Sequence, residues 1–201
     1  DITSEQEAAL LNSFYKYVDT ENPSLIILED YNKGVLTPNI ITSVIDYCNA
    51  KGIPTAVDPK QKNFLAYKNC TLFKPNLKEV KEGLKISVGD ISVQNLNKVH
   101  TALNESLQNV ISFITLSEHG VYFSDGKEQK LIPTHIRNIS DVSGAGDTVI
   151  AVASLVYASS KNILLAAEIS NIAGGMVCEL VGTAPINKND LAAEVAKLLT
   201  K

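Results

Sequence analysis

The sequence is poor in cysteine, methionine and tryptophan, with three, one and none of these residues among 201. The cysteines, Cys48, Cys70 and Cys178, are widely spaced and form neither a CxxC pair nor a zinc-ligand pattern. We therefore expect no disulfide framework and no structural zinc site. Small buried thiols in a reducing, cytoplasmic compartment are expected instead.

Long apolar runs and a leader pattern are also missing. No run reaches the roughly 18–20 residues that a membrane-spanning helix requires, and the polar, acidic stretch 1–8 lacks the features of a signal peptide. The chain starts at Asp1, and its one methionine is Met176. We therefore expect either a processed product or part of a longer chain.

Arginine is scarce, because Arg137 is the one arginine among 18 basic residues, and the net charge is −4. Proteins that bind nucleic acids or anionic membranes neutralise phosphates with clustered lysines and arginines. We therefore expect no nucleic-acid partner and no membrane partner.

The composition, 45% hydrophobic and 20% charged, is that of one ordinary globular domain. Short apolar runs that suit buried parallel strands alternate with amphipathic stretches that suit helices. This alternation predicts an α/β fold with a mostly parallel sheet. The predicted strands are 24–29, 54–57, 71–73, 110–116, 121–123 and 130–132. The predicted helices are 5–18 (with Ser4 as N-cap), 37–50, 76–85, 91–108 (with His100 on its surface), 144–159 (apolar nearly all round, hence interior), 162–180 and 188–200.

Polar residues follow four of the predicted strands. Ligands of open parallel sheets bind beyond the carboxyl ends of the strands, which share one edge. Local turn formation explains any single one of these groups, but four in succession favour a binding site at that edge. The groups are Glu29-Asp30, Asp58-Pro59-Lys60, Lys74-Pro75-Asn76 and Ser117-Glu118.

The segment Asp141-Val-Ser-Gly-Ala-Gly-Asp147-Thr lies where a loop enters the predicted helix 144–159. Gly144 and Gly146 allow backbone N–H groups to approach a ligand, and a helix N-terminus offers unpaired donors and partial positive charge. Asp147 in the first turn is placed to accept a proton from an attacking hydroxyl, an arrangement that suits phosphoryl transfer. The alternative is a capped helix start in which Asp147 satisfies its own first-turn donors. The dinucleotide fingerprint and the P-loop are both absent from the sequence.

The same segment resembles the second signature of the ribokinase-like (PfkB) carbohydrate kinases. Asn76-Leu-Lys-Glu79 resembles the N-x-x-E motif of that family, and Thr115-Leu-Ser-Glu-His-Gly120 resembles its T-x-G-x-x-G nucleotide loop, with Ser117 in place of the first Gly. The resemblance implies a three-layer αβα ribokinase-like fold. It also implies ATP and Mg²⁺ as cofactors, K⁺ as a further cation, and ATP and a sugar phosphate as partners.

Within the family, the details resemble the kinases that act on heptose 7-phosphate. These details are Asp30-Tyr31-x-Lys33-Gly34, Asp58-Pro59-Lys60, Val142 in the signature, and Asp147-Thr-Val-Ile150. Family members carry earlier strands, a sugar-binding signature and a β lid before the point where this sequence starts. We therefore expect residues 1–201 to be the C-terminal, nucleotide-binding and catalytic portion of a PfkB-type kinase domain, without the N-terminal strands and lid. The full-length protein is expected to form a homodimer.

The resemblance assigns roles to individual residues. Asp147 becomes the catalytic base, and Gly144, Ala145 and Gly146 donate N–H groups to the transferred phosphoryl group. Asn76 and Glu79 act on Mg²⁺ and the phosphates, although they also have the spacing of a helix capping box. The remaining nucleotide-binding residues are Thr115, Ser117, Glu118, Gly120 and Asn171.

Two further sets complete the expected site. Lys33 and Lys60 would contact the sugar phosphate, with solvated surface lysines as the alternative. Asp141 and Ser143, with carbonyl groups near Val177, Leu180 and Gly182, resemble a potassium site.

The expected reaction is ATP-dependent phosphorylation of heptose 7-phosphate to heptose 1,7-bisphosphate, in the synthesis of ADP-heptose for the lipopolysaccharide core. Two alternatives stay open at this point. One is another PfkB-family kinase acting on fructose phosphate, ribose or a nucleoside, and the other is an inactive nucleotide-binding fragment.

Overall fold

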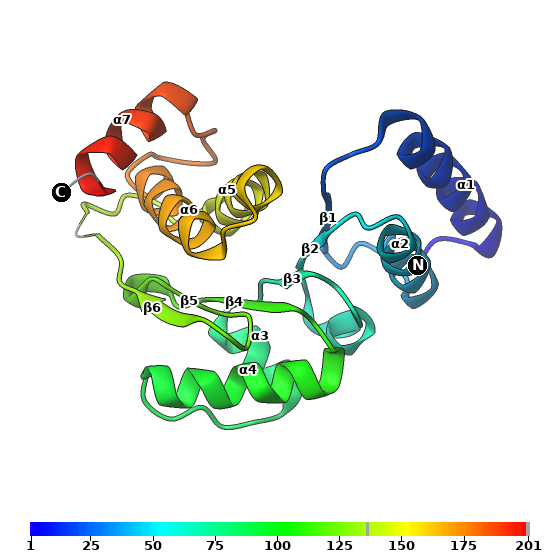
Figure 1. The fold of residues 1–201 in the computed structure, drawn as a ribbon, viewed down its shortest axis with the longest axis horizontal. Coiled ribbons are helices and arrows are strands. Elements are labelled where there is room, and N and C mark those ends of the chain that lie inside the picture. Colours follow the sequence, from blue (N-terminus) through cyan, green and yellow to red (C-terminus); the bar gives the residue numbers. More distant parts are fainter. Residues whose placement is uncertain (136, 200–201) are drawn as a thin grey trace.

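The computed structural model describes residues 1–135 and 137–199, and in that part of the chain six strands form one sheet in the order β1-β2-β3-β4-β5-β6 (Figure 1). The strands are β1 (Ile26–Glu29), β2 (Thr55–Asp58), β3 (Leu72–Phe73), β4 (Ile111–Thr115), β5 (Val121–Ser124) and β6 (Gln129–Ile132). The helices are α1 (Ser4–Glu21), α2 (Pro38–Ala50), α3 (Leu77–Leu84), α4 (Val93–Leu107), α5 (Ala145–Ser160), α6 (Ile163–Val177) and α7 (Lys188–Leu199), with short 3₁₀ helices η1 (Gln61–Ala66) and η2 (Ser117–His119).

The sheet is mostly parallel, as the sequence predicts. Strands β1 to β4 pair in parallel, whereas β4-β5 and β5-β6 pair antiparallel. The turn between β5 and β6 is held by the Asp125 side chain, which accepts hydrogen bonds from the backbone N–H groups of Lys127 and Glu128. Because β1 to β4 run parallel to one another, their carboxyl ends share one edge of the sheet.

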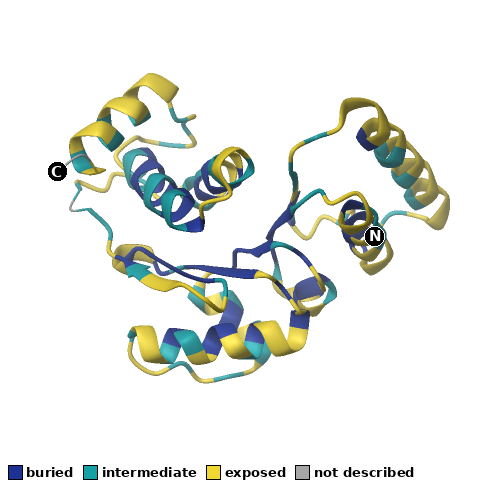
Figure 2. Cartoon of the chain, viewed as in Figure 1, coloured by how far each residue is buried: buried dark blue, intermediate teal, exposed yellow. Residues whose placement is uncertain are grey.

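Helices cover both faces of the sheet, giving three layers (Figure 2). Neighbouring residues along a strand point to opposite faces. Val57 and Phe73 pack with α2, α3 and α4 in one core, whereas Ala56 and Leu72 pack with α5 and α6 in the other. This double burial explains why the strands are continuous apolar runs. The three-layer α/β fold with a mostly parallel sheet, which the sequence predicts, is confirmed.

The helix boundaries differ from the predictions in small ways. The N-cap of α1 is Thr3 rather than Ser4, and Thr3 forms a reciprocal capping box with Gln6. Helix α6 ends at Val177, short of the predicted 180. The last residue of the predicted helix 188–200 lies outside the described residues.

Helix α5 is not fully interior, in contrast to the prediction. Val149, Ile150 and Ala153 are buried against α6 and the sheet, but Leu155 is 71% exposed. Neighbouring layers cover one side of α5 and leave its other side open. Burial among the described residues therefore explains the apolar residues on the covered side of α5, but not those on its open side.

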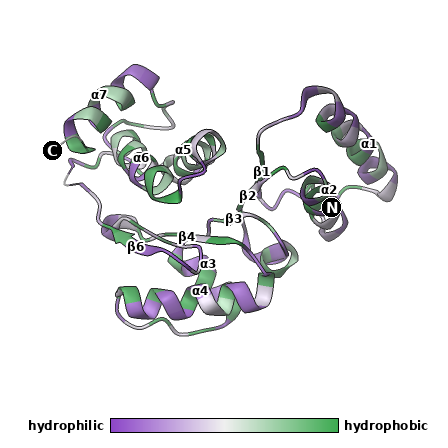
Figure 3. Cartoon of the chain, viewed as in Figure 1, coloured by the Kyte–Doolittle hydropathy of each residue, from purple (hydrophilic) through white to green (hydrophobic). Residues whose placement is uncertain are grey.

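His100 is buried at 7% exposure, so its predicted surface position is wrong. Helix α4 is amphipathic, with hydrophobic and hydrophilic residues alternating along it (Figure 3), and His100 lies on its inner side. Its Nδ1 lies 2.9 Å from the Ser112 hydroxyl of β4, and Asn109 also donates to that hydroxyl. Because the Ser112 hydroxyl offers a hydrogen-bonding partner, the His100 imidazole can be buried against the sheet.

His100 predicts a loss of stability in mild acid. Burial lowers the pKa of His100, against a smaller opposing effect of Asp125. The unfolded chain therefore takes up the proton first, at about pH 6.5, and the free energy of unfolding falls as the pH drops below that value. His100→Gln should flatten the decline between pH 7.5 and 5.5 in urea titrations. The exposed His119→Gln serves as control, and equal declines in all three proteins would contradict the role of His100.

Candidate active site

A cavity of about 640 Å³ opens where the carboxyl ends of the central strands meet the start of α5. Residues far apart in the sequence meet here, because β3, β4, α5 and α6 all present their ends to it. Its walls also include apolar groups, among them Val121, Val142 and Val149. Eight residues expected from the sequence line it: Asn76, Thr115, Ser117, Glu118, Gly120, Ala145, Gly146 and Asn171.

The start of α5 is open to a ligand. Gly144 precedes the helix with a φ of 78°, in the left-handed region, and makes no side-chain cap. In the described part of the chain, no backbone N–H donates to the Asp147 carboxylate; its Oδ2 instead accepts a hydrogen bond of 2.7 Å from the Tyr31 hydroxyl. The alternative in which Asp147 caps its own helix is therefore not realised. The Ala145 N–H donates to the Val142 carbonyl at 3.3 Å, and the carboxylate of Asp147 does not compete for the donors of the first turn.

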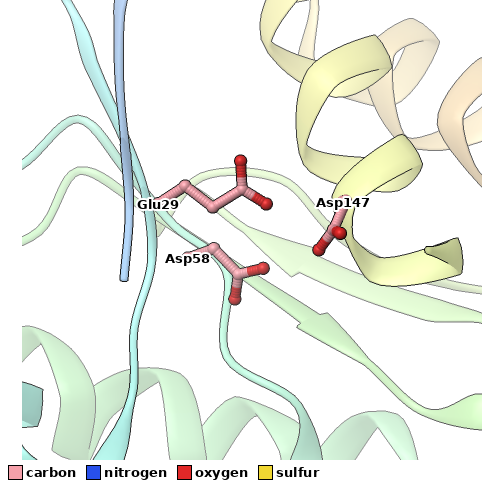
Figure 4. Close-up of side chains that lie close together, drawn as sticks. All are labelled: Glu29, Asp58 and Asp147. Carbon is pink, nitrogen blue, oxygen red and sulfur yellow. The ribbon is translucent and has the colours of Figure 1, made fainter. Parts of the chain in front are cut away.

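Three carboxylates converge at this point, from the ends of β1 and β2 and from α5 (Figure 4). Oxygen atoms of Glu29, Asp58 and Asp147 all lie within 4.8 Å of one another. Burial and then the neighbouring Asp147 raise the pKa of Glu29. The hydrogen bond to Asp147 raises the pKa of Tyr31 to about 12, so Tyr31 stays a hydrogen-bond donor at neutral pH.

A buried lysine balances part of this negative charge. Lys74, directly after β3, is 3% exposed, and its Nζ lies 3.1 Å from Asp58 Oδ2. Burial raises the pKa of the Asp58 carboxyl, and the charges of Lys74 and Lys60 oppose that rise. Sequence reasoning noted Glu29, Asp58 and Lys74 at the sheet edge and Tyr31 within a family resemblance, but it gave none of them a role.

Asn76 and Glu79 form the capping box that their spacing suggests. The Asn76 side chain accepts from the Glu79 N–H, and Glu79 Oε2 accepts from the Asn76 N–H, both at 2.8 Å. Glu79 Oε1 also accepts from Lys60 Nζ at 3.2 Å. Lys60 thus lies beside Glu79, whereas Lys33 is exposed, with no ion pair to a described residue.

The loop after β4 holds Ser117, the position at which this sequence departs from the nucleotide-loop motif that it resembles. Ser117 adopts a φ of 52°, a left-handed conformation that glycine adopts at least cost. Gly120 has a φ of 88°, and a Cβ there would lie 2.0 Å from the Ile132 carbonyl oxygen. Leu116 and Gly120 close this loop with a backbone hydrogen bond of 2.8 Å. Thr115 and Glu118 reach the cavity from the two ends of the loop.

The far wall of the cavity is formed by α6 and by the loop before α5. Asn171 is 7% exposed, and its Nδ2 donates to the Pro133 carbonyl. Arg137 bridges Glu179 and Glu194 with contacts of 2.7 and 2.8 Å, which ties α7 to this wall. His135 and Arg137 line the cavity and were not anticipated, because neither belongs to a motif or to a periodic element.

The expected potassium-site residues are neighbours in the structure. Asp141 Oδ1 accepts from the Ser143 N–H at 2.9 Å, and Oδ2 accepts from the Gly182 N–H at 3.1 Å. The Val177 carbonyl accepts from the Leu180 N–H at 3.0 Å. Backbone donors therefore engage both Asp141 oxygens and the Val177 carbonyl, and they lower the pKa of Asp141.

Similarity to known proteins gives this geometry a context. The profile of the pfkB family carbohydrate kinases matches residues 4–190. The chain belongs to this family. It is 35% identical over 198 residues to a protein named bifunctional protein HldE from Sulfurimonas denitrificans, covering 98% of the chain and 40% of that relative. The HldE of Campylobacter jejuni (strain 81116) is 38% identical over 166 residues, covering 83% and 35%. The chain thus spans about two fifths of the length of these relatives.

Solved structures share the fold of this PfkB-family chain at lower sequence identity. Phosphofructokinase-2 from Escherichia coli, in complex with potassium, superposes with a TM-score of 0.82 at 17% identity, covering 95% of the chain and 62% of that protein. Ribokinase from Arabidopsis thaliana, complexed with ribose and ATP, gives 0.72 at 15% identity, with coverage of 90% and 58%. Among the described residues, no helix has both the length and the apolar character needed to cross a membrane.

The turn at Gly120 yields a stability prediction, for which Gly52 is the control. At Gly52 the φ is 69° and no atom lies within 4 Å of an added Cβ. Gly52→Ala should therefore lower the free energy of unfolding only by the backbone strain, about 1–2 kcal/mol. Gly120→Ala adds a collision with the Ile132 carbonyl, which should cost about 1–3 kcal/mol more. Urea denaturation of both variants measures the difference, and equal losses would contradict the close approach at Gly120.

Proposed function

We propose that this chain is part of an ATP-dependent sugar-phosphate kinase that converts heptose 7-phosphate to heptose 1,7-bisphosphate. This product is a precursor of ADP-heptose, which is used for the lipopolysaccharide core. The PfkB family membership supports sugar phosphorylation, and the similarity to proteins named HldE supports the heptose substrate. The substrate comes from that similarity, since the positions of Lys33 and Lys60, the residues proposed to contact the sugar phosphate, do not distinguish one sugar from another.

One observation carries the proposed reaction. The Asp147 carboxylate stands at the N-terminus of α5, bound by Tyr31 rather than by its own helix. In the proposed mechanism Asp147 accepts the proton of the attacking hydroxyl. The N–H groups of Gly144, Ala145 and Gly146 stabilise the charge on the phosphoryl group in transit, with the Ala145 N–H turning from the Val142 carbonyl, to which it donates at 3.3 Å in the structure. Both groups belong to one rigid helix start, which fixes their mutual distance.

The cavity supports a nucleotide as the second substrate. Its apolar walls suit a base, and Asn171 provides a buried amide whose Nδ2 is already bound to Pro133, which leaves the carbonyl oxygen as acceptor. Thr115, Ser117, Glu118 and Gly120 form the loop beside it. We assign the base to the α6 side and the phosphates to the α5 side.

Asn76 and Glu79 would hold Mg²⁺, together with phosphate oxygens of the nucleotide. Their donor chemistry fits, because Mg²⁺ prefers oxygen ligands and few carboxylates, and Glu79 is held in place by its capping box. Magnesium supplies charge neutralisation on the phosphates. For K⁺, Asp141 and Ser143, with carbonyls of Val177, Leu180 and Gly182, form the proposed oxygen-donor set. The hydrogen bonds of Asp141 hold the loops on which these groups lie.

We also propose that residues 1–201 are the C-terminal portion of a PfkB-type kinase domain. Strand β1 pairs on one side only, with β2, in the described residues. Ile27 of β1 itself is 40% exposed. Further strands beside β1 would cover such a sheet edge and would complete the sugar side of the site.

The proposal is tested by measuring ADP release with Mg-ATP and D-glycero-D-manno-heptose 7-phosphate. Fructose 6-phosphate, ribose, a nucleoside and no sugar serve as controls. The chain is compared with a version extended at its N-terminus by the sequence encoded upstream. Release that depends on heptose supports the proposal. Release with another sugar alone would replace the substrate, and silence of both proteins with every acceptor would favour an inactive nucleotide-binding module.

Asp147→Asn should lower the turnover number by about 10²–10⁴-fold, because the variant keeps the shape of the side chain and loses the base. Asp190→Asn is the matched control, since Asp190 is also an exposed aspartate in the first turn of a helix. Steady-state ADP release measures both. Retained turnover in Asp147→Asn would remove the base from the mechanism, and an equal loss in Asp190→Asn would mean that the effect is not local.

A further inference from the structure

The hydroxyl of Tyr31 engages the carboxylate that the proposed reaction needs as its base. It donates a hydrogen bond of 2.7 Å to Asp147 Oδ2, and it lies 3.4 Å from Glu29 Oε1. A general base lies about 2.6–3.2 Å from the oxygen whose proton it accepts. The phenol oxygen of Tyr31 thus holds Asp147 at the distance that an attacking hydroxyl or water molecule would need.

The backbone on both sides of Tyr31 is fixed. The Asp30 carboxylate is buried, and it accepts hydrogen bonds from the Tyr67 hydroxyl at 2.8 Å and from the Asn32 N–H at 2.6 Å. The Asp30 N–H donates to the Asp58 carbonyl at 3.0 Å, which continues the pairing of β1 with β2. Asp30 therefore anchors the turn that carries Tyr31.

The side chain of Tyr31, in contrast, is open to solvent. Tyr31 is 56% exposed, and exposed side chains change rotamer on a timescale of picoseconds to nanoseconds. The ring can therefore leave Asp147 by rotation about its own side-chain bonds, without any movement of the sheet edge. The hydrogen bond to Asp147 raises the pKa of Tyr31 to about 12, so the hydroxyl keeps its proton at neutral pH.

We propose that Tyr31 is a positioning residue that gates Asp147: its hydroxyl holds the carboxylate until an acceptor hydroxyl displaces it, and it thereby denies the base to water. This inference rests on the proposed function. In the hydrolysis that the gate prevents, a water oxygen bonds to the γ-phosphorus of ATP, and the proton of that water goes to Asp147. The bond between the γ-phosphorus and the β,γ-bridging oxygen breaks, and its electron pair stays on ADP.

The gate distinguishes an acceptor sugar from water by binding energy. A sugar phosphate makes contacts through groups that do not react, and this binding energy can offset the loss of the hydrogen bond between Tyr31 and Asp147. Water has no such additional groups. An acceptor therefore opens the gate, whereas water meets a base that is already engaged.

The first measurement is ADP release from Mg-ATP without any sugar. Tyr31→Phe keeps the ring and removes the hydroxyl, so hydrolysis should rise by roughly 10-fold, the lower end of the range for losing a hydrogen bond to a charged group. Tyr47→Phe is the matched control, because Tyr47 also donates to an aspartate, Asp19, at 2.7 Å, but on the surface between α1 and α2. The gain in Tyr31→Phe should vanish when Asp147→Asn is added, because the base is then lost.

A second measurement observes the contact without turnover. In the chain labelled with carbon-13 at the Cζ atoms of its tyrosines, the Tyr31 resonance is the one that Tyr31→Phe removes. Asp147→Asn should shift this resonance, because the phenol loses a charged acceptor, and it should leave the resonance of Tyr47 in place. A Tyr31 resonance that does not move in Asp147→Asn overturns the inference.

The outcomes separate the inference from the proposed function. Hydrolysis that does not rise in Tyr31→Phe, that rises equally in Tyr47→Phe, or that persists without Asp147 overturns the gate. Heptose-dependent ADP release by the unmodified chain or its N-terminally extended version would then leave the proposed function standing. A gain that depends on Asp147, without heptose-dependent release by either protein, supports the gate and overturns the heptose substrate.

Discussion

The parallel register of β1 and β2 is the constraint on which the rest of the site depends. Glu29 pairs with Asp58 across these two strands, so their carboxylates emerge side by side at the same edge. Helix α5 brings Asp147 to that edge, and three carboxylates meet within 4.8 Å. Such an arrangement repels itself, and the neighbouring groups can be understood as responses to that repulsion.

The compensation comes from three different sources. Tyr31 donates a neutral hydrogen bond to Asp147, Lys74 pairs with Asp58, and the N-terminus of α5 adds partial positive charge. The pKa of Glu29 is still raised, first by burial and then by the neighbouring Asp147 and Asp58. Buried charge such as that of Asp58 and Lys74 contributes little to folding. The protein tolerates it at an edge where, under the proposed function, bound cations would complete the balance.

The sequence predicted the parts of the molecule that depend on local pattern. Apolar runs located every strand, and the motif beginning at Asp141 located the start of α5. Contacts between distant segments could not be predicted in this way. Tyr31 and Asp147 are 116 residues apart, and no periodicity links them. His100 was misplaced for the same reason, because its burial depends on Ser112 of a strand that the helix pattern does not reveal.

The two sides of the site differ in how they are built. The cavity proposed for the nucleotide is lined by residues between Asn76 and Cys178, which lie on elements packed within the two cores. The proposed acceptor side borders β1, whose outer edge is open in the described residues. Nucleotide affinity should therefore depend on the internal packing of this chain, while acceptor affinity depends on what lies beside β1. Under the proposed function, ATP binding without sugar turnover would place the limiting element at the β1 edge rather than at Asp147 or the α5 turn.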